Sequence, residues 1–292
     1  MTAAGSVWPR DEGCPRPGCA PPRDRRQWCD ERCPLGPPAG PRVGRRGRRH
    51  EHGCFPGGRL RVFDEWDGTP TIPLERALED SLRSAVARDR PQDGFLGEEG
   101  GQFGPSSTCW IVDPIDGTRV FIDGGRAWGT QIALQVDDTL TFGVTSAPAL
   151  GRRWWGLVGE GAWLNSDHSV MRPLRVSARS PHQPLRWSSH PPIDAVSPKW
   201  RQVAEELHRV GDYVAPDPHA VPMVIQGEIE AALQLKGAAW DYAAFAAIVQ
   251  SAGGHFSYLD SSTALGGVRP ALFTNGSAHE RSLAALAGTG PD

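Results

Sequence analysis

A regular pattern of apolar and polar positions begins at about residue 62 and continues towards the end of the chain. Residues 73–88 carry an apolar side chain at every fourth position, which places these side chains on one face of a predicted helix. They are Leu74, Leu78, Leu82 and Val86. Residues 93–101 follow as a predicted loop. The apolar run 109–113 then predicts a buried strand that ends at an aspartate.

Three further stretches have the composition of strands. They are residues 127–136, 139–148 and 152–163. The pair Asp137-Asp138 predicts the first turn between them, and residues 147–152 predict a wider second turn. Strands that follow one another through such turns indicate an antiparallel meander.

The last third of the chain alternates helices with strands. Residues 198–210 predict an amphipathic helix, and residues 219–235 show a helical pattern followed by a strand pattern. Residues 241–252 are apolar on nearly all sides, so we expect a buried helix that ends at Gly253. Two more strands and a closing helix complete this part, at 255–260, 270–276 and 277–288. This alternation predicts a layered α/β arrangement.

These patterns divide the chain into three parts. Residues 1–61 form a low-complexity segment, residues 62–184 an α+β domain, and residues 185–292 an α/β domain. The boundary between the two domains is expected in the proline-rich stretch 181–192.

The first 60 residues differ from the rest in composition and charge. They hold 12 Arg, no Lys and 6 acidic residues, a net charge of +6, whereas the other 232 residues hold 19 basic and 28 acidic residues, a net charge of −9. Ten Gly and ten Pro interrupt any periodicity in this segment. We therefore predict that residues 1–61 are disordered.

Other interpretations of this segment stay open. Five of the six cysteines lie in it: Cys14, Cys19, Cys29, Cys33 and Cys54. A zinc site would combine Cys29 and Cys33 with His50, His52 and Cys54, a spacing looser than that of structural zinc sites. The arginine-rich run 45–49 is typical of a solvated charge block, with RNA contact as the alternative. An out-of-frame translation is a further hypothesis, because 29 of the 31 basic residues are Arg.

The composition of the whole chain excludes some classes of protein. The net charge is −3, which argues against a general nucleic-acid binder. No apolar run approaches the ~18 residues of a membrane helix, and no apolar leader opens the chain. We therefore expect a cytoplasmic protein, in which Cys109 is a buried, reduced thiol that packs as a small apolar side chain.

Three acidic clusters carry the candidate chemistry. They contain Glu98 and Glu99, Asp113 and Asp116, and Asp241. Mg²⁺ prefers oxygen ligands, and two carboxylates three residues apart at the end of a strand can converge on a pair of metal ions. Gly117 and Thr118 then offer backbone N–H groups to a phosphate. Two metal ions that bind a phosphate ester and activate water are a known route to hydrolysis.

Each acidic residue also has an ordinary structural interpretation. Glu98 and Glu99 taken alone are typical of solvated loop charges, and Asp116 before a glycine is typical of a turn. Asp241 at the start of a helix is typical of an N-cap. Only the joint pattern of the clusters favours a metal site.

Three segments together resemble the inositol monophosphatase family of Mg²⁺-dependent phosphatases. They are FLGEEGG at 95–101, WIVDPIDGTRVF at 110–121 and WDYAAFAAIVQSAGG at 240–254, in the order that the family has them. The resemblance covers roughly residues 67–290. It implies an α/β/α/β/α sandwich, Mg²⁺ as the cofactor, a small-molecule phosphate ester as the substrate, and a protein that is often a homodimer.

The same resemblance implies roles for individual residues. Glu98, Asp113 and the Ile115 carbonyl would bind the first metal ion, and Asp113, Asp116 and Asp241 the second. Gly117 and Thr118 would bind the phosphate, and Glu98 and the Thr118 hydroxyl would orient the attacking water. Trp240 would pack behind Asp241.

Two regions vary from the general family pattern. Residues 146–163 look like the bacterial histidinol-phosphatase branch, and Asp212 and Glu228 are weaker candidates for contacts with the substrate.

Ile72 and Glu75 stand where the family has Thr and Asp, and this Asp helps to activate the water. A glutamate at 75 carries one more methylene, and an error of ~1 Å in a reacting group can cost ~100-fold in rate.

The leading interpretation is a phosphomonoesterase that acts on inositol 1-phosphate, histidinol phosphate or a similar small polyol or amino-alcohol phosphate. One alternative is an impaired or truncated family member that only binds metal or ligand. Another is a bisphosphate nucleotidase or fructose-1,6-bisphosphatase activity.

Overall fold

The computed structural model describes residues 49–55, 58–64, 70–105, 107–166, 171–180, 182–193, 198–259 and 269–286. Residues 1–48 lie outside this set, and so do the side chains of His50, His52 and Cys54. The zinc, RNA and reading-frame hypotheses for the N-terminal segment therefore fall outside the described residues. No helix in the described part of the chain is long and apolar enough to cross a membrane.

A small antiparallel sheet precedes the first helix. Its strands, in sheet order, are β1 (Arg49–Phe55), β2 (Gly58–Asp64) and β3 (Pro70–Thr71). Regular structure therefore begins before residue 62. Val62 and Ile72 are buried in one apolar cluster with Ile115, Phe121 and Ile122. This cluster joins the small sheet to the end of the strand that carries the aspartates.

An eight-stranded sheet forms the first large layer. In sheet order its strands are β11 (Arg172–Leu174), β10 (Gly161–Ser166), β9 (Arg152–Leu157), β8 (Thr139–Ala147), β7 (Gly129–Val136), β6 (Thr108–Asp116), β4 (Gly94–Gly97) and β5 (Gly101–Phe103). Only β4 and β6 pair in parallel; every other neighbouring pair is antiparallel. The predicted meander is confirmed, and its first turn is at Asp137 and Asp138, both with positive φ.

Two predictions for this sheet are wrong in detail. Residues 152–163 form two strands, because Gly159 has a φ of 91° and the N–H of Glu160 bonds back to the carbonyl of Leu157. Residues 93–101 are not a plain loop, because β4 pairs with β6 and β5 pairs with β4. The glycine-rich sequence hid these strands, which tertiary pairing stabilises.

A five-stranded sheet forms the second large layer. Its strands, in sheet order, are β13 (Gly211–Tyr213), β12 (Leu185–His190), β14 (Ala231–Gln234), β16 (Ala271–Thr274) and β15 (His255–Tyr258). β12 pairs in parallel with β13 and β14, whereas β16 is antiparallel to β14 and β15. The carboxyl ends of β12 and β14 therefore meet at one edge, where His190 pairs with Gln234.

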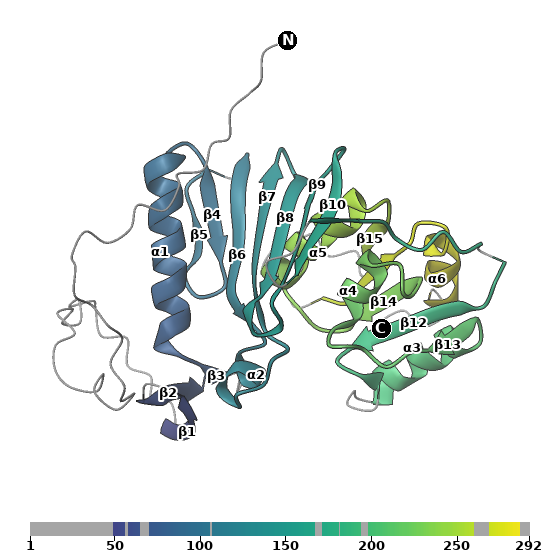
Figure 1. Cartoon of the computed structure of the whole chain (residues 1–292), viewed down its shortest axis with the longest axis horizontal. Coiled ribbons are helices and arrows are strands. Elements are labelled where there is room, and N and C mark those ends of the chain that lie inside the picture. Colours follow the sequence, from purple (N-terminus) through teal and green to yellow (C-terminus); the bar gives the residue numbers. More distant parts are fainter. Residues whose placement is uncertain are drawn as a thin grey trace, which may run out of the picture.

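Helices separate and cover the two sheets (Figure 1). They are α1 (Pro73–Asp89), α2 (Thr118–Ile122), α3 (Pro198–His208), α4 (Ala220–Ile225), α5 (Ala239–Ser251) and α6 (His279–Leu286), with a 3₁₀ turn at Pro148–Leu150. Helix α1 lies along the eight-stranded sheet, α4 and α5 lie between the sheets, and α3 and α6 cover the five-stranded sheet. This order of layers is the predicted α/β/α/β/α sandwich.

The buried helix α5 packs directly on the first sheet. A Cβ at Gly143 of β8 would come within 2.3 Å of the Ala244 carbonyl oxygen, and one at Gly156 of β9 would come within 2.7 Å of the Ser251 side chain. Only glycine allows this close approach. The prediction of a helix that is buried on nearly all sides is thus confirmed, and Gly253 ends it with a φ of 90°.

Helix α1 has an unusual orientation of its side chains. Leu74 and Leu78 on its apolar face are 40% and 39% exposed, whereas Glu75 and Glu79 are each 2% exposed. The helix therefore turns two carboxylates towards the interior of the protein. The four-residue spacing of its leucines predicted the helix but not the direction that it faces.

Candidate active site

Three aspartates from two elements meet at the end of the eight-stranded sheet. Asp113 and Asp116 lie in the last four residues of β6, and Asp241 is the third residue of α5. Carboxylate oxygens of the three lie within 4.8 Å of one another. Residues three apart in a regular strand point to opposite faces, but the pairing of β6 with β7 is irregular between Asp113 and Asp116. This irregularity allows both side chains to reach one site.

Asp113 is the most unusual of the three. It is 1% exposed, and no N–H or hydroxyl group of the described residues donates to its oxygens, although its carboxyl group hydrogen-bonds with that of Glu98. Burial, followed by the nearby charges of Glu98, Asp116 and Asp241, raises the pKa of Asp113 well above its usual range. An unpaired buried carboxylate is costly, and a bound cation removes that cost. The oxygen-only donor set suits a hard divalent ion such as Mg²⁺.

Glu98 faces the same cluster from the turn after β4. Its backbone N–H donates to the Val112 carbonyl oxygen at 3.3 Å, which ties the turn to β6. Burial and the negative charge of Asp241 raise the pKa of Glu98 to about 9. The predicted fourth carboxylate therefore shares the electrostatic environment of the three aspartates.

Asp116 and Asp241 each have a hydrogen-bond donor. Gln131 Nε2 donates to Asp116 Oδ2 at 2.6 Å, and the Ala238 N–H donates to Asp241 Oδ2 at 2.5 Å. The N-cap of α5 is Ala238, so the interpretation of Asp241 as the N-cap is wrong; Asp241 is the third residue of the helix, and its side chain accepts the N–H of the N-cap residue. Burial and the charge of Asp116 raise the pKa of Asp241 to about 7. Burial also raises the pKa of Asp116, against the influence of His190 and Gln131.

Glu75 reaches the site despite its unexpected length. Thr118 Oγ1 donates to Glu75 Oε1 at 2.5 Å and lies 3.2 Å from the Ile115 carbonyl oxygen. The other oxygen of Glu75 accepts the Ile72 N–H at 2.9 Å and lies 3.1 Å from the Thr71 hydroxyl. Both oxygens are therefore held in place, one on the start of α1 and one on Thr118.

Gly117 forms the corner between β6 and α2. Its φ of 87° is a left-handed conformation, and a Cβ there would lie 3.2 Å from the Ala127 carbonyl oxygen. The chain can therefore turn sharply after Asp116 and begin α2 at Thr118. The first N–H groups of a helix have no acceptor within the helix, which leaves them available to an anion.

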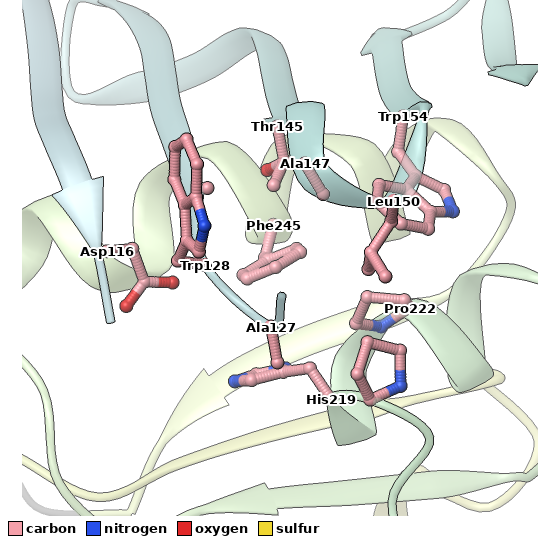
Figure 2. A pocket seen from close by; sticks show the side chains of 12 residues that line it. Asp116, Ala127, Trp128, Thr145, Ala147, Leu150, Trp154, His219, Pro222 and Phe245 are labelled. Atoms are coloured by element: carbon pink, nitrogen blue, oxygen red, sulfur yellow. The ribbon is translucent and has the colours of Figure 1, made fainter. Parts of the chain in front are cut away.

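An aromatic pocket opens beside Asp116 (Figure 2). Trp128, Phe245, Leu150 and Trp154 are among the residues that line it, and His219 lies on the opposite side. The rings of His219 and Phe245 stack with centroids 5.3 Å apart. The pocket therefore offers mainly flat apolar surface next to the acidic cluster.

Two half-buried histidines, His190 and His219, lie side by side, and His219 lines this pocket. The rings of His190 and His219 have centroids 4.2 Å apart. Burial lowers the pKa of His190, which the charge of Asp116 partly offsets, and burial lowers the pKa of His219 well below its usual range. His219 Nδ1 accepts the Val221 N–H at 3.3 Å, so its other ring nitrogen carries the proton in the neutral form.

Asp212 and Glu228 lie elsewhere. Both are exposed. Asp212 pairs with Arg186 near the start of β12, and Glu228 bonds to Gln226 just before β14. These positions are at the end of the parallel strands opposite His190. The structure does not bring either residue to the acidic cluster. Trp240, predicted to pack behind Asp241, packs half-buried on the apolar cluster that contains Leu96 and Ala243.

Sequence patterns did not single out several residues that surround the cluster. Gln131 is 0% exposed, and it was hidden among ordinary strand residues. The sequence did hold one indication: Gln131 is two residues before Ala133, so both side chains are on the same face of the strand, and Ala133 faces inward. Glu79 was hidden because a glutamate one turn after Glu75 is common on solvated helices. His190 carried no local signal, because only the pairing of β12 with β14 places it.

Comparison with known proteins agrees with this geometry. A family model described as "Inositol monophosphatase family" matches residues 67–289. Because the match covers well over half of the chain, the protein belongs to this family, and it is a phosphatase of the phosphomonoester class.

Two individual relatives and one solved structure illustrate the similarity. The chain is 36% identical over 238 residues to a histidinol-phosphatase of Mycobacterium tuberculosis, which covers 78% of this chain and 88% of the relative. It is 32% identical over 193 residues to an inositol-1-monophosphatase of Caulobacter vibrioides, covering 63% and 73%. A solved structure of a Thermotoga maritima IMPase superposes with a TM-score of 0.63 at 21% identity, covering 78% of this chain and 87% of that one. The last comparison supports the fold.

Proposed function

We propose that the protein is a Mg²⁺-dependent phosphomonoesterase that hydrolyses a small amino-alcohol or polyol phosphate. Histidinol phosphate is the first candidate substrate, and inositol 1-phosphate is the second. The observation that carries the proposal is Asp113, a fully buried carboxyl group with one oxygen within 4.8 Å of carboxyl oxygens of Asp116 and Asp241. Keeping this group ionised at neutral pH is costly, and a bound cation would offset that cost.

The donor atoms fit a pair of Mg²⁺ ions. Glu98, Asp113 and the Ile115 carbonyl would hold one ion, and Asp113, Asp116 and Asp241 would hold the other. When bound, the ions stabilise charge on the phosphoryl oxygens and make water a better nucleophile. The remaining steps fall to groups of the protein itself.

Thr118 and Glu75 are placed to handle the proton of the attacking water. Because Thr118 donates its own hydrogen to Glu75, its oxygen lone pairs are oriented to accept a hydrogen bond from a water. As that water attacks phosphorus, its proton passes to Thr118 Oγ1 while the Thr118 proton passes to Glu75. The backbone N–H groups at Gly117 and Thr118 bind the phosphate oxygens.

The aromatic pocket supports an amino-alcohol substrate with a flat ring. A polyol needs several polar partners for its hydroxyl groups, whereas this pocket is lined by apolar side chains such as those of Trp128 and Leu150. An imidazole ring can stack on such side chains. The histidinol-phosphatase among the relatives supports the same choice.

The test is a phosphate-release assay on a panel of esters, with and without Mg²⁺. The panel contains histidinol phosphate, inositol 1-phosphate, fructose 1,6-bisphosphate and adenosine bisphosphate. We expect Mg²⁺-dependent turnover, highest on histidinol phosphate, and loss of at least ~1000-fold in Asp113→Asn. The matched control is Asp138→Asn, an exposed turn aspartate, which should leave the rate unchanged.

Other outcomes point to other functions. Higher turnover on a bisphosphate would replace the proposed substrate class with the bisphosphatase alternative. Mg²⁺ binding without turnover of any ester would support the alternative of an impaired protein that only binds ligand. Full activity in Asp113→Asn would refute the assigned site.

A further inference from the structure

The Glu79 side chain accepts two hydrogen bonds from the loop 97–100, which is distant from it in the sequence. It lies on α1, one turn after Glu75, and it is 2% exposed. Its Oε2 accepts the N–H of Glu99 and its Oε1 accepts the N–H of Gly100, both at 2.7 Å. Each carboxylate oxygen therefore binds one of two consecutive backbone N–H groups. Such a pair of N–H groups forms a small concave site for an anion.

The loop is shaped to receive this carboxylate. A Cβ at Gly97 would lie 2.2 Å from the carboxyl carbon of Glu79, and a Cβ at Gly100 would lie 2.6 Å from Oε1. Neither glycine has a positive φ, so the backbone alone does not require glycine at these positions. The two glycines leave the space that Glu79 fills. They flank the metal-ligand candidate Glu98 on both sides.

Other contacts hold the same loop from both sides. The Arg76 guanidinium, on the same helix, donates to the Glu99 carbonyl oxygen at 2.8 Å. On the other side, the Glu98 N–H donates to Val112 of β6 at 3.3 Å. The loop is therefore held between α1 and the strand that carries Asp113. Glu79 supplies the two shortest of these contacts.

We infer that Glu79 is a positioning residue that sets the conformation of the loop 97–100 and so directs Glu98 to the metal ions. This inference rests on the metal site of the proposed function. Glu79 itself does not touch the metal or the substrate. Residues that orient a metal ligand in this way typically change metal affinity 10–100-fold when they are replaced.

The experiment measures Mg²⁺ binding directly, by isothermal titration calorimetry on the full chain after treatment with chelator. In Glu79→Gln the shape is retained, but an amide NH₂ now faces a backbone N–H. We expect the Kd for Mg²⁺ to rise ~10–100-fold, with a Tm in chelator that stays within about 3 °C of wild type. The control is Asp80→Asn on the same helix, an exposed residue paired with Arg83, which should leave the Kd unchanged.

A second variant approaches the same contact from the loop. Gly100→Ala places a methyl group 2.6 Å from Glu79 Oε1, too close for the present contact, and it should raise the Kd by a similar factor. In the double variant Glu79→Gln with Gly100→Ala the effects of the two single variants on the Kd should be less than additive in free energy, because both weaken the same contact. Gly100→Ala alone also tests the inference if Glu79→Gln does not fold.

The outcomes separate this inference from the proposed function. Kd values within about 2-fold of wild type in both Glu79→Gln and Gly100→Ala would overturn it. A lower Tm in chelator together with an unchanged Kd would show a purely structural role and would also overturn it. If wild type binds Mg²⁺ but hydrolyses no ester, the proposed function fails while the Kd values still decide the role of Glu79. If wild type binds no Mg²⁺, both fail.

Discussion

At the residue scale, the hydrogen-bond partners of each buried carboxylate separate the tasks in the site. No N–H or hydroxyl group of the described residues donates to Asp113, whereas Asp116 accepts a hydrogen bond from an amide and Asp241 accepts one from a backbone N–H. Glu75 accepts the hydroxyl of Thr118. A carboxylate without donors suits a metal ion, whereas one that accepts a hydroxyl hydrogen suits proton transfer.

Glu75 gives the sharpest kinetic prediction at this scale. Glu75→Gln removes the proton acceptor of Thr118, so kcat should fall ~100–10,000-fold while the Mg²⁺ Kd stays within about 3-fold. Glu75→Asp should also lower kcat, by ~100-fold, because the shorter stem draws the carboxylate away from Thr118. Steady-state kinetics and calorimetry measure the two quantities. An aspartate variant as active as wild type would show that the contact with Thr118 does not limit the rate.

Motif residues could be placed from the sequence, and residues without a motif could not. Asp113, Asp116 and Asp241 were expected to converge because three segments appear in a known order. Asp212 and Glu228 had no such support and lie away from the cluster. Gln131 and His190 contribute only through pairing between strands far apart in the sequence, which no local pattern records.

At the element scale, the site depends on how closely α5 approaches the eight-stranded sheet. Asp241 is in the first turn of α5, and the glycines of β8 and β9 set the distance between helix and sheet. The strong apolar character of residues 241–252 made this helix predictable. Its direct contact with glycines was not, because a glycine in a strand pattern is equally typical of a bulge.

Gly143→Ala tests this packing. The added methyl would lie 2.3 Å from the Ala244 carbonyl oxygen, so α5 must move away from β8. We expect a loss of about 1–3 kcal/mol in the free energy of unfolding, measured in urea, together with weaker Mg²⁺ binding because Asp241 moves with the helix. Thr139→Ala, at the exposed start of the same strand, is the control. An unchanged urea midpoint would mean that α5 moves away from β8 without any loss of stability.

At the scale of the whole molecule, the acidic cluster links stability to pH. Without metal, the folded protein keeps protons on carboxyls that the unfolded chain has already lost, since the pKa is about 7 for Asp241 and about 9 for Glu98. The stabilising contribution of a raised pKa is complete below the unfolded pKa near 4 and is lost as pH rises through the folded value. His190 and His219 have lowered pKa values, so their contribution to stability rises with pH up to the unfolded value of 6.5, and they oppose this trend only below that pH.

The Tm in chelator should therefore fall by more than about 3 °C as pH rises from about 7 to about 9, and added Mg²⁺ should restore more stability at pH 9 than at pH 7. Calorimetric scans with and without Mg²⁺ measure both effects. In Asp113→Asn the Tm in chelator should depend less on pH, because the substitution removes one charge from the acidic cluster. A Tm that rises with pH in the absence of metal would contradict the coupling.

The layered architecture was predictable because helix and strand periods alternate so regularly after residue 62. The exceptions are the strands β4 and β5, whose glycines resemble those of a loop, and the direction in which α1 faces. In both cases the deciding contacts are polar and come from distant parts of the chain, Val112 for the first and Thr118 for the second.

The inverted orientation of α1 has a consequence for anyone who redesigns this protein. A designer guided by amphipathic patterning would move the outward leucines 74 and 78 inward and replace the buried glutamates by apolar residues. The result would satisfy every rule for a helix on a sheet, and it would delete the acceptor of Thr118 and the anchor of the 97–100 loop together. In α1, therefore, the substitutions that would improve packing by the usual criteria are the ones that would remove the site.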